Sequence, residues 1–216
     1  MATPARNVVA LRTRDSERTR LEIRRAAMAV FAEVGLGGAR VDKIAERAGI
    51  DKKLIYYYFG SKEKLFLSAL ELTYADIREA ELALRLEDQE PAEAVRRLVA
   101  FTWDHFLKHP EFLMLLNSEN LHRARHLKQS EHVREMNSPL IRMLGEILER
   151  GRRDGVFRGG VDPVHLYITI AGLAYFYLSN SATLSAIFGR DLRSPKALSE
   201  RLSHITEVVM GYLLRD

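Results

Sequence analysis

The 216-residue sequence contains no cysteine, which excludes disulfides and thiolate metal sites and is typical of a cytoplasmic protein. No apolar run reaches the length of about 18 residues that a membrane-spanning helix needs. The N-terminus shows no apolar core followed by a cleavage site, so we find no signal peptide. We therefore expect a cytoplasmic protein without a membrane segment.

Sequence motifs of catalysis are also missing. We find no paired carboxylates at a recognisable spacing, no glycine-rich phosphate loop and no nucleophile motif. Two histidine pairs, His105/His109 and His122/His126, have the spacing that can place two imidazoles on one metal, but no HExxH motif accompanies them. We interpret these histidines as surface or capping residues. We expect a non-enzyme that holds no metal and no cofactor.

The positive charge of the chain is concentrated near its start. Residues 1–64 contain 14 Lys/Arg and 8 Asp/Glu, whereas residues 65–216 contain 19 and 21. Such an asymmetry favours a polyanionic partner for the N-terminal part, with ordinary variation of surface charge as the alternative. Hydrophobic residues make up 47% of the chain, which indicates a globular protein.

A helix-turn-helix pattern lies in the basic part of the chain. Residues 41–48 read as a short amphipathic helix, and Gly49 supplies the tight turn. Asp51 is a suitable N-cap for a second helix over residues 52–58. The second helix of this motif enters the major groove of DNA in many proteins, so we expect a DNA-binding unit over residues 15–60.

Helical patterns account for the rest of the chain as well. A flexible arm over residues 1–14 precedes a first helix over 16–34, which we expect to bury Ala27, Val30, Phe31 and Val34. Nothing alternates convincingly with period two, as a strand would. We therefore predict an all-α fold of about nine helices. The later ones are expected over residues 61–86, 91–109, 130–153, 162–188 and 195–214, with shorter helical pieces through residue 128.

Three short motifs carry a resemblance to the TetR family of transcription regulators. They are IAERAG at Ile44–Gly49, IYYYF at Ile55–Phe59 and SKEKL at Ser61–Leu65. The resemblance implies a TetR-like fold in which residues 61–216 form a ligand-binding and dimerisation domain. It implies a repressor that a small-molecule effector releases from a palindromic double-stranded DNA operator. The alternative is a DNA-binding regulator or architectural protein without a ligand.

The candidate DNA-binding residues lie around the second helix of the motif. Lys52 and Lys53 begin that helix and can donate to guanine, and Leu54 can contact a thymine methyl group. Tyr56 and Tyr57 share the outward face and can donate to phosphates, whereas we expect Tyr58 to pack inside. A protein-binding tyrosine patch is the alternative.

Two further phosphate contacts are expected beside that helix. Arg40 stands where the family often has a hydroxyl cap, and it can offer a charged contact to phosphate instead. The resemblance implies a phosphate contact by Lys62. The arm residues Arg12, Arg14 and Arg18 either add affinity for DNA or belong to a solvated tail.

The remaining expectations concern dimerisation and the effector. The helices over 162–188 and 195–214 are the candidates for a homodimer interface, the first being apolar nearly all round; the alternative is that they form this chain's own core. The polar stretch 117–128 is expected to meet a ligand, and it vaguely resembles a TetR subgroup tied to the catabolism of small ring compounds. The candidate ligand-binding residues are Trp103, Phe106, Glu119, Asn120, His122, Met143, Tyr167 and Tyr175.

Overall fold

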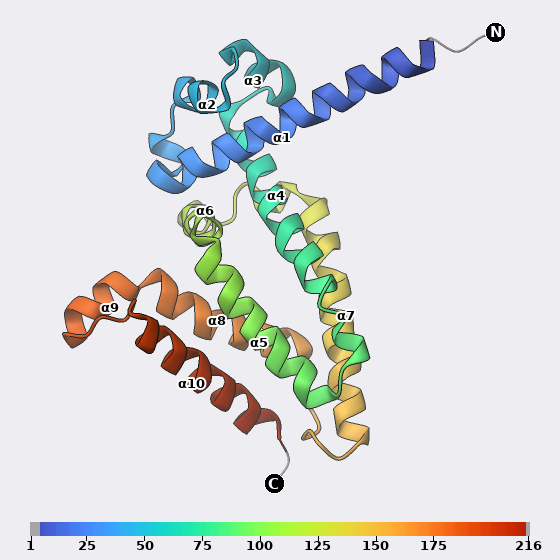
Figure 1. Ribbon diagram of the computed structural model, residues 1–216, viewed down its shortest axis with the longest axis vertical. Coiled ribbons are helices and arrows are strands. Elements are labelled where there is room, and N and C mark those ends of the chain that lie inside the picture. Colours follow the sequence, from blue (N-terminus) through green and yellow to red (C-terminus); the bar gives the residue numbers. More distant parts are fainter. Residues whose placement is uncertain (1–4, 215–216) are drawn as a thin grey trace. The chain divides into compact units, whose positions relative to one another are not determined.

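The computed structural model describes the backbone of residues 5–214 and the side chains of residues 15–136 and 138–214. Its described part is all-helical (Figure 1), which confirms the predicted fold class, with one isolated bridge between Phe157 and Leu214. None of the described helices is long and apolar enough to span a membrane. The α-helices are α1 (Ala5–Gly38), α2 (Val41–Ala48), α3 (Lys52–Phe59), α4 (Lys62–Leu82), α5 (Pro91–Lys108), α6 (Pro110–Leu121), α7 (Glu131–Arg153), α8 (Pro163–Ser179), α9 (Ser181–Phe188) and α10 (Pro195–Leu213).

The chain forms two compact units. The first unit comprises residues 1–73 and 114–130, and the second comprises residues 74–113 and 131–216. Helices α4 and α6 each contribute residues to both units. The unit that contains the helix-turn-helix therefore includes the start of α4 and a segment from the middle of the chain, and it is larger than residues 15–60.

The first unit has its own apolar core. Ile44 of α2, Ile55 of α3 and Phe66 of α4 are fully buried in it, and Phe66 packs edge-on against Phe31 of α1 with ring centroids 5.1 Å apart. Leu115 of α6 belongs to the same core. These contacts fix the short helices α2 and α3, which are too short to be stable alone.

Helix α1 departs from the sequence prediction at both ends. It begins at Ala5 and not near Ser16, since residues 5–34 contain no proline or glycine that would stop a helix. Of the predicted arm, residues 1–4 lie outside the described residues. At the other end α1 bends at Gly35, which has a φ of 68°. Val34 is 54% exposed just before that bend, so its predicted burial is wrong.

The turn between α2 and α3 follows the sequence prediction. Gly49 has a φ of 66°, and its backbone N–H donates to the last carbonyls of α2. The Asp51 side chain accepts a 2.7 Å hydrogen bond from the Lys53 backbone N–H, which caps α3. The start of the second short helix is thereby fixed relative to the first.

The second unit has a separate core built from α5, α7, α8 and α10 together with the end of α4. Leu98 and Trp103 of α5, Leu144 of α7 and Ile170 of α8 are buried in it. The predicted caps of α8 and α10 are present, because Asp162 and Ser194 accept from backbone N–H groups. The apolar helix predicted over 162–188 is interrupted at Asn180, which ends α8 and precedes α9.

Candidate functional site

The outer face of α3 carries five exposed side chains. Lys52, Lys53, Leu54, Tyr56 and Tyr57 are all exposed, with Tyr57 78% and Tyr56 46% accessible. On the inner face Ile55 is 1% exposed and packs in the core of the first unit. The structure therefore places five of the seven predicted DNA-binding residues together on one face of α3.

Asp42 of α2 holds one of these cations in place. The Lys52 Nζ lies 2.7 Å from the Asp42 Oδ1, and the Arg40 guanidinium lies 3.9 Å from Oδ2 of the same carboxylate. The hydrogen bond from Lys52 lowers the pKa of the Asp42 carboxyl and raises the pKa of Lys52. Arg40 makes no side-chain cap for α2, as expected, and remains exposed beside the start of α3.

The three tyrosines of α3 differ in their surroundings. Tyr58 is half-buried, and the guanidinium of Arg20 lies 5.1 Å from the centre of its ring. The ring of Tyr57 packs edge-on against that of Tyr58 with centroids 5.0 Å apart, yet it stays exposed. The division of Tyr56 and Tyr57 from Tyr58, which the sequence predicted, agrees with these positions.

Lys62 has a structural contact that the sequence did not predict. Its Nζ donates to the backbone carbonyls of Leu36 and Ala39, at 2.9 and 3.1 Å, and so ties the start of α4 to the end of α1. An ammonium group has three N–H donors. Two are used in these contacts, which leaves one for the phosphate contact that the family resemblance implied.

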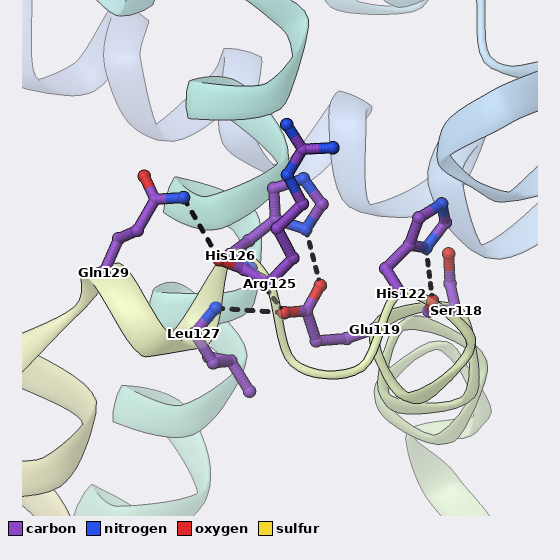
Figure 2. A network of polar contacts seen from close by, with 7 residues as sticks. All are labelled: Ser118, Glu119, His122, Arg125, His126, Leu127 and Gln129. Atoms are coloured by element: carbon purple, nitrogen blue, oxygen red, sulfur yellow. Dashed lines mark hydrogen bonds and ion pairs between the residues drawn. The ribbon is translucent and has the colours of Figure 1, made fainter.

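The polar stretch 117–128 belongs to the first unit, where Glu119 organises it (Figure 2). The Glu119 side chain is 1% exposed. One of its oxygens accepts from the backbone N–H groups of His126 and Leu127, at 2.7 and 2.9 Å, and the other accepts from His126 Nδ1 at 2.7 Å. This carboxylate is thus fully engaged in closing the loop after α6.

The other polar residues of this stretch lie close to Glu119. The His126 ring packs against Phe66 of α4 with centroids 5.2 Å apart, and His122 Nδ1 donates to the Ser118 carbonyl (Figure 2). Asn120 and His122 are exposed. Glu119, Asn120 and His122 thus belong to the first unit, whereas the other five candidate ligand residues belong to the second.

Those other candidates do share one unit. Trp103 and Phe106 are almost fully buried, and the Trp103 ring lies 5.7 Å from that of Tyr177. The predicted residues Met143, Tyr167 and Tyr175 are partly buried and pack against the same core. Five of the eight predicted ligand residues therefore lie in or against the core of the second unit.

A buried ionic cluster lies in the second unit, and the sequence analysis missed it. Arg78 Nη1 lies 2.8 Å from Glu81 Oε2, and the two side chains are 6% and 1% exposed. Arg78 Nη2 donates to the Tyr167 hydroxyl at 2.7 Å. Burial raises the pKa of Glu81 to about 7, against the opposing effect of Arg78. The sequence indicated only the burial of Glu81, which continues the helical stripe of Thr73 and Ile77, and gave no sign of its partners.

Helices α8 and α10 expose apolar side chains that nothing in the described chain covers. Val164, Ile168 and Phe176 are spaced at multiples of four residues along α8, and each is at least 44% exposed. Val208 and Tyr212 are spaced in the same way on α10 and are 41% and 46% exposed. Exposed apolar side chains at this spacing on two helices make α8 and α10 candidates for a protein–protein interface.

The paired histidines do not form a metal site with other ligands in the described part of the chain. The rings of His105 and His109 lie 4.4 Å apart, and His109 Nδ1 lies 3.1 Å from a Glu111 oxygen. Among the described residues no group of three or more metal-ligating side chains comes together. Burial lowers the pKa of His105 to about 4, with a further contribution from His109.

Two family models match the chain. The model described as bacterial regulatory proteins of the tetR family matches residues 23–69. The model described as a tetracyclin repressor-like C-terminal domain matches residues 91–209, which is more than half of the chain. Among curated proteins, the chain is 41% identical over 205 residues to the HTH-type transcriptional repressor NicS of Pseudomonas putida, covering 95% of this chain and 97% of that protein.

Solved structures share the fold at lower identity. A TetR family transcription regulator from Marinobacter aquaeolei has a TM-score of 0.70 at 17% identity, covering 95% of this chain and 100% of that one. The regulator FadR from Bacillus subtilis, solved in complex with stearoyl-CoA, has a TM-score of 0.65 at 19% identity, covering 89% of this chain and 98% of that one. At these identities the likeness concerns the fold.

Proposed function

The chain belongs to the TetR family of bacterial transcription regulators, and on that premise we propose that it is a dimeric repressor released from its operator by a small molecule. The observation that carries this proposal is the exposed, basic and aromatic face of α3 on a capped helix-turn-helix. Nearly the whole chain is similar to a protein that is named as a repressor, which supports repression rather than activation. Regulation of transcription would place it in the cytoplasm.

We infer that α3 enters the major groove. Lys53 is exposed at the start of α3, where residues of such helices meet base edges, and its ammonium can donate to guanine O6 and N7. Leu54 is exposed beside it and suits a thymine methyl group. Tyr56 and Tyr57 are placed to donate to phosphates, which orients the head without reading sequence.

The backbone contacts at the edge of this face would come from Arg40, Lys52 and Lys62. Arg40 is free of any cap contact, and Asp42 holds Lys52 in a fixed position. Lys62 keeps one N–H donor beyond its two carbonyl contacts. Because each neutralised phosphate releases counterions, we expect the affinity to fall steeply as salt concentration rises.

The dimer would form through the exposed apolar faces of α8 and α10. Ile168 and Phe176 of α8 and Tyr212 of α10 would pack against the same residues of a second copy, since a two-fold interface pairs one patch with itself. A two-fold symmetric protein reads two half-sites one helical turn apart, so the operator would be a palindrome.

The effector would bind in the second unit, among its aromatic side chains. Trp103, Phe106, Tyr167 and Tyr175 provide ring surfaces in or beside its core, and they suit a small ring-containing metabolite. Glu119 and His126 would serve the head, because their hydrogen bonds close the loop after α6 and the His126 ring packs against Phe66 of the first unit.

Selection from a pool of random DNA duplexes tests the repressor proposal, because it lets the protein itself choose the operator sequence. We expect the full chain to enrich a palindromic sequence, to bind it as two protomers per duplex, and to lose affinity with increasing salt. A screen of small metabolites against the selected duplex would then identify compounds that release the protein. Failure to enrich any duplex would contradict the proposal.

A further inference from the structure

In the Arg78–Glu81–Tyr167 cluster, the Arg78 guanidinium contacts both of the other side chains. The Arg78 guanidinium lies over the Tyr167 ring, 5.3 Å from its centre, and donates through Nη2 to the hydroxyl. Its Nη1 meets Glu81 Oε2 at 2.8 Å. All three side chains come from within the second unit, with Arg78 and Glu81 one turn apart on α4 and Tyr167 on α8.

The hydrogen-bonding capacity of this cluster is only partly used. Among the described residues, neither Arg78 Nε nor Glu81 Oε1 has a hydrogen-bond partner, and the contact between Nη1 and Oε2 is an ion pair without hydrogen-bond geometry. Buried polar groups in proteins almost always have partners, and buried charges are costly without them. Arg78 and Glu81, whose side chains are both more than nine-tenths buried, are poised to exchange their ion pair for a better partner.

We propose that Arg78, with Glu81 and Tyr167, binds the carboxylate of a small anionic effector. This inference rests on the proposed function and gives its effector a chemical class. The planar guanidinium presents its N–H groups in a fork that matches a carboxylate in two parallel hydrogen bonds. The Tyr167 hydroxyl, which accepts from Arg78, keeps its own proton to donate to the same ligand.

The charges around Arg78 favour an anion. Glu81 holds a proton readily, since burial raises its pKa to about 7, so it can give up its role as counterion when an anion arrives. Burial lowers the pKa of His105 of α5 to about 4, so this imidazole is uncharged at neutral pH. The charges of His109 and Glu111 also act on His105, the first lowering its pKa and the second raising it. An arriving carboxylate would therefore replace the negative charge of Glu81, and Glu81 would take up a proton from solvent.

Aromatic rings beside His105 would hold the body of the ligand. The rings of Phe101 and Phe112 lie 5.5 and 6.4 Å from that of His105, and Tyr74 packs edge-on against Phe112. Flat rings of this kind favour offset or edge-on contact with another ring. The ligand class is thus a small carboxylic acid that carries a ring.

The position of the cluster on α4 links the ligand to the head. Helix α4 runs without interruption from Lys62 to Leu82, and its first residue is anchored to the end of α1 by two hydrogen bonds. Separation of Arg78 from Glu81 changes the packing of the last turns of this helix. A shift of α4 along or about its axis would then reach the first unit through the helix itself.

A thermal-shift panel of ring-bearing monocarboxylates, headed by benzoate and cyclohexanecarboxylate, tests the proposal when each acid is paired with its amide. We expect at least one acid to raise the melting temperature of the full chain and to release the selected operator, with its amide inactive. Arg78→Gln is expected to weaken binding of that acid roughly tenfold or more. Tyr167→Phe keeps the ring and the fold and is expected to weaken binding by a smaller factor.

Calorimetry measures proton uptake on binding, which would not change if Arg78 and Glu81 had a purely structural role. Binding of the acid at pH 7.5 should take up a fraction of a proton, seen as a dependence of the binding enthalpy on the ionisation enthalpy of the buffer, and Glu81→Gln should remove it. The proposal is overturned if no acid of the panel binds, if amides bind as well as acids, or if Arg78→Gln binds the acid unchanged. If the ligand-free protein still binds the selected operator in those cases, only the carboxylate proposal fails. If the ligand-free protein binds no operator, the proposed function itself is refuted.

Discussion

The carboxylate of Glu119 lies 2.7 Å from His126 Nδ1 and also accepts hydrogen bonds from two backbone N–H groups across the loop that follows α6. Glu119 thus acts as a clamp on a segment that packs against α4, since the His126 ring contacts Phe66. Both residues are buried in the unit that carries the helix-turn-helix. The stability of that unit should therefore depend on a residue far from α3 in the sequence.

Glu119→Ala is expected to lower the free energy of unfolding by about 3 kcal/mol, because it leaves one buried and one part-buried backbone N–H and a buried imidazole without their acceptor. Urea denaturation measures this loss. The matched control is Asn120→Ala at the neighbouring exposed position, which should change stability by no more than about 0.5 kcal/mol. Equal effects of the two substitutions would refute the clamp.

Gly151→Ala tests a close approach in the second unit. A Cβ at Gly151 of α7 would overlap the ring of Phe157, which is 1% exposed and cannot move outward. We expect a loss of roughly 1–3 kcal/mol in the free energy of unfolding, typical of overpacking. Gly145→Ala on the same helix is the control, since the nearest neighbouring side-chain atom, from Pro163, lies 3.8 Å from its added Cβ, and it should not destabilise the protein.

Glu81 should make the stability of the protein depend on pH. Its folded pKa of about 7 lies above the value of 4.5 for a free side chain. The folded state therefore binds the proton more tightly, so this contribution is full below about pH 4.5 and is lost as pH rises through 7. We expect the difference in unfolding free energy between wild type and Glu81→Gln to change by roughly 1–3 kcal/mol between pH 5 and pH 8.

The stability contributed by His105 changes with pH in the opposite direction to that of Glu81, so the comparison must separate the two contributions. Its folded pKa of about 4 lies below the value of 6.5 for a free imidazole, so its contribution is present above pH 6.5 and is lost as pH falls toward 4. Both proteins in the comparison contain His105, so its effect cancels in the difference. A pH-independent difference would show that Glu81 is ionised throughout.

Ile168→Glu should dissociate the dimer. The side chain is 57% exposed on α8, so a charge there is tolerated in the protomer but would be buried without a partner in the interface. Light scattering with size-exclusion chromatography should show a protomer of 24.7 kDa. Leu82→Glu is the control, at a side chain that is 54% exposed on α4 and belongs to neither of the two candidate interface helices, and it should remain dimeric.

The sequence predicted best those features that depend on local chemistry. Asp51, Asp162 and Ser194 each cap a helix as expected, because a cap needs only a polar side chain two or three residues from an open N–H group. The turn at Gly49 was also predictable, because glycine adopts a positive φ without strain. The exposed face of α3 followed from helical spacing alone, once the start of the helix was known.

Features that depend on tertiary contacts were not predictable. The polar stretch 117–128 looked like a ligand site because its polar side chains had no evident partners in the sequence. In the structure Glu119 finds its partners within the stretch itself, seven and eight residues further on, once the chain closes into a loop. The two carbonyl contacts of Lys62 are separated from it by 23 and 26 residues. Arg78 and Tyr167 are 89 residues apart, so the buried cluster could not be seen from spacing on α4 alone.

The most direct measurement of the central claim is the affinity of Lys53→Ala for a selected operator at fixed salt, compared with Lys108→Ala. Lys108 is also an exposed lysine, at the end of α5, and it is paired with Asp104. We predict that Lys53→Ala weakens operator binding by about 1–3 kcal/mol and relaxes the preference for one base pair, while Lys108→Ala leaves both unchanged. Indistinguishable affinities for the two variants and the wild-type protein would contradict the assignment of α3 as the recognition helix.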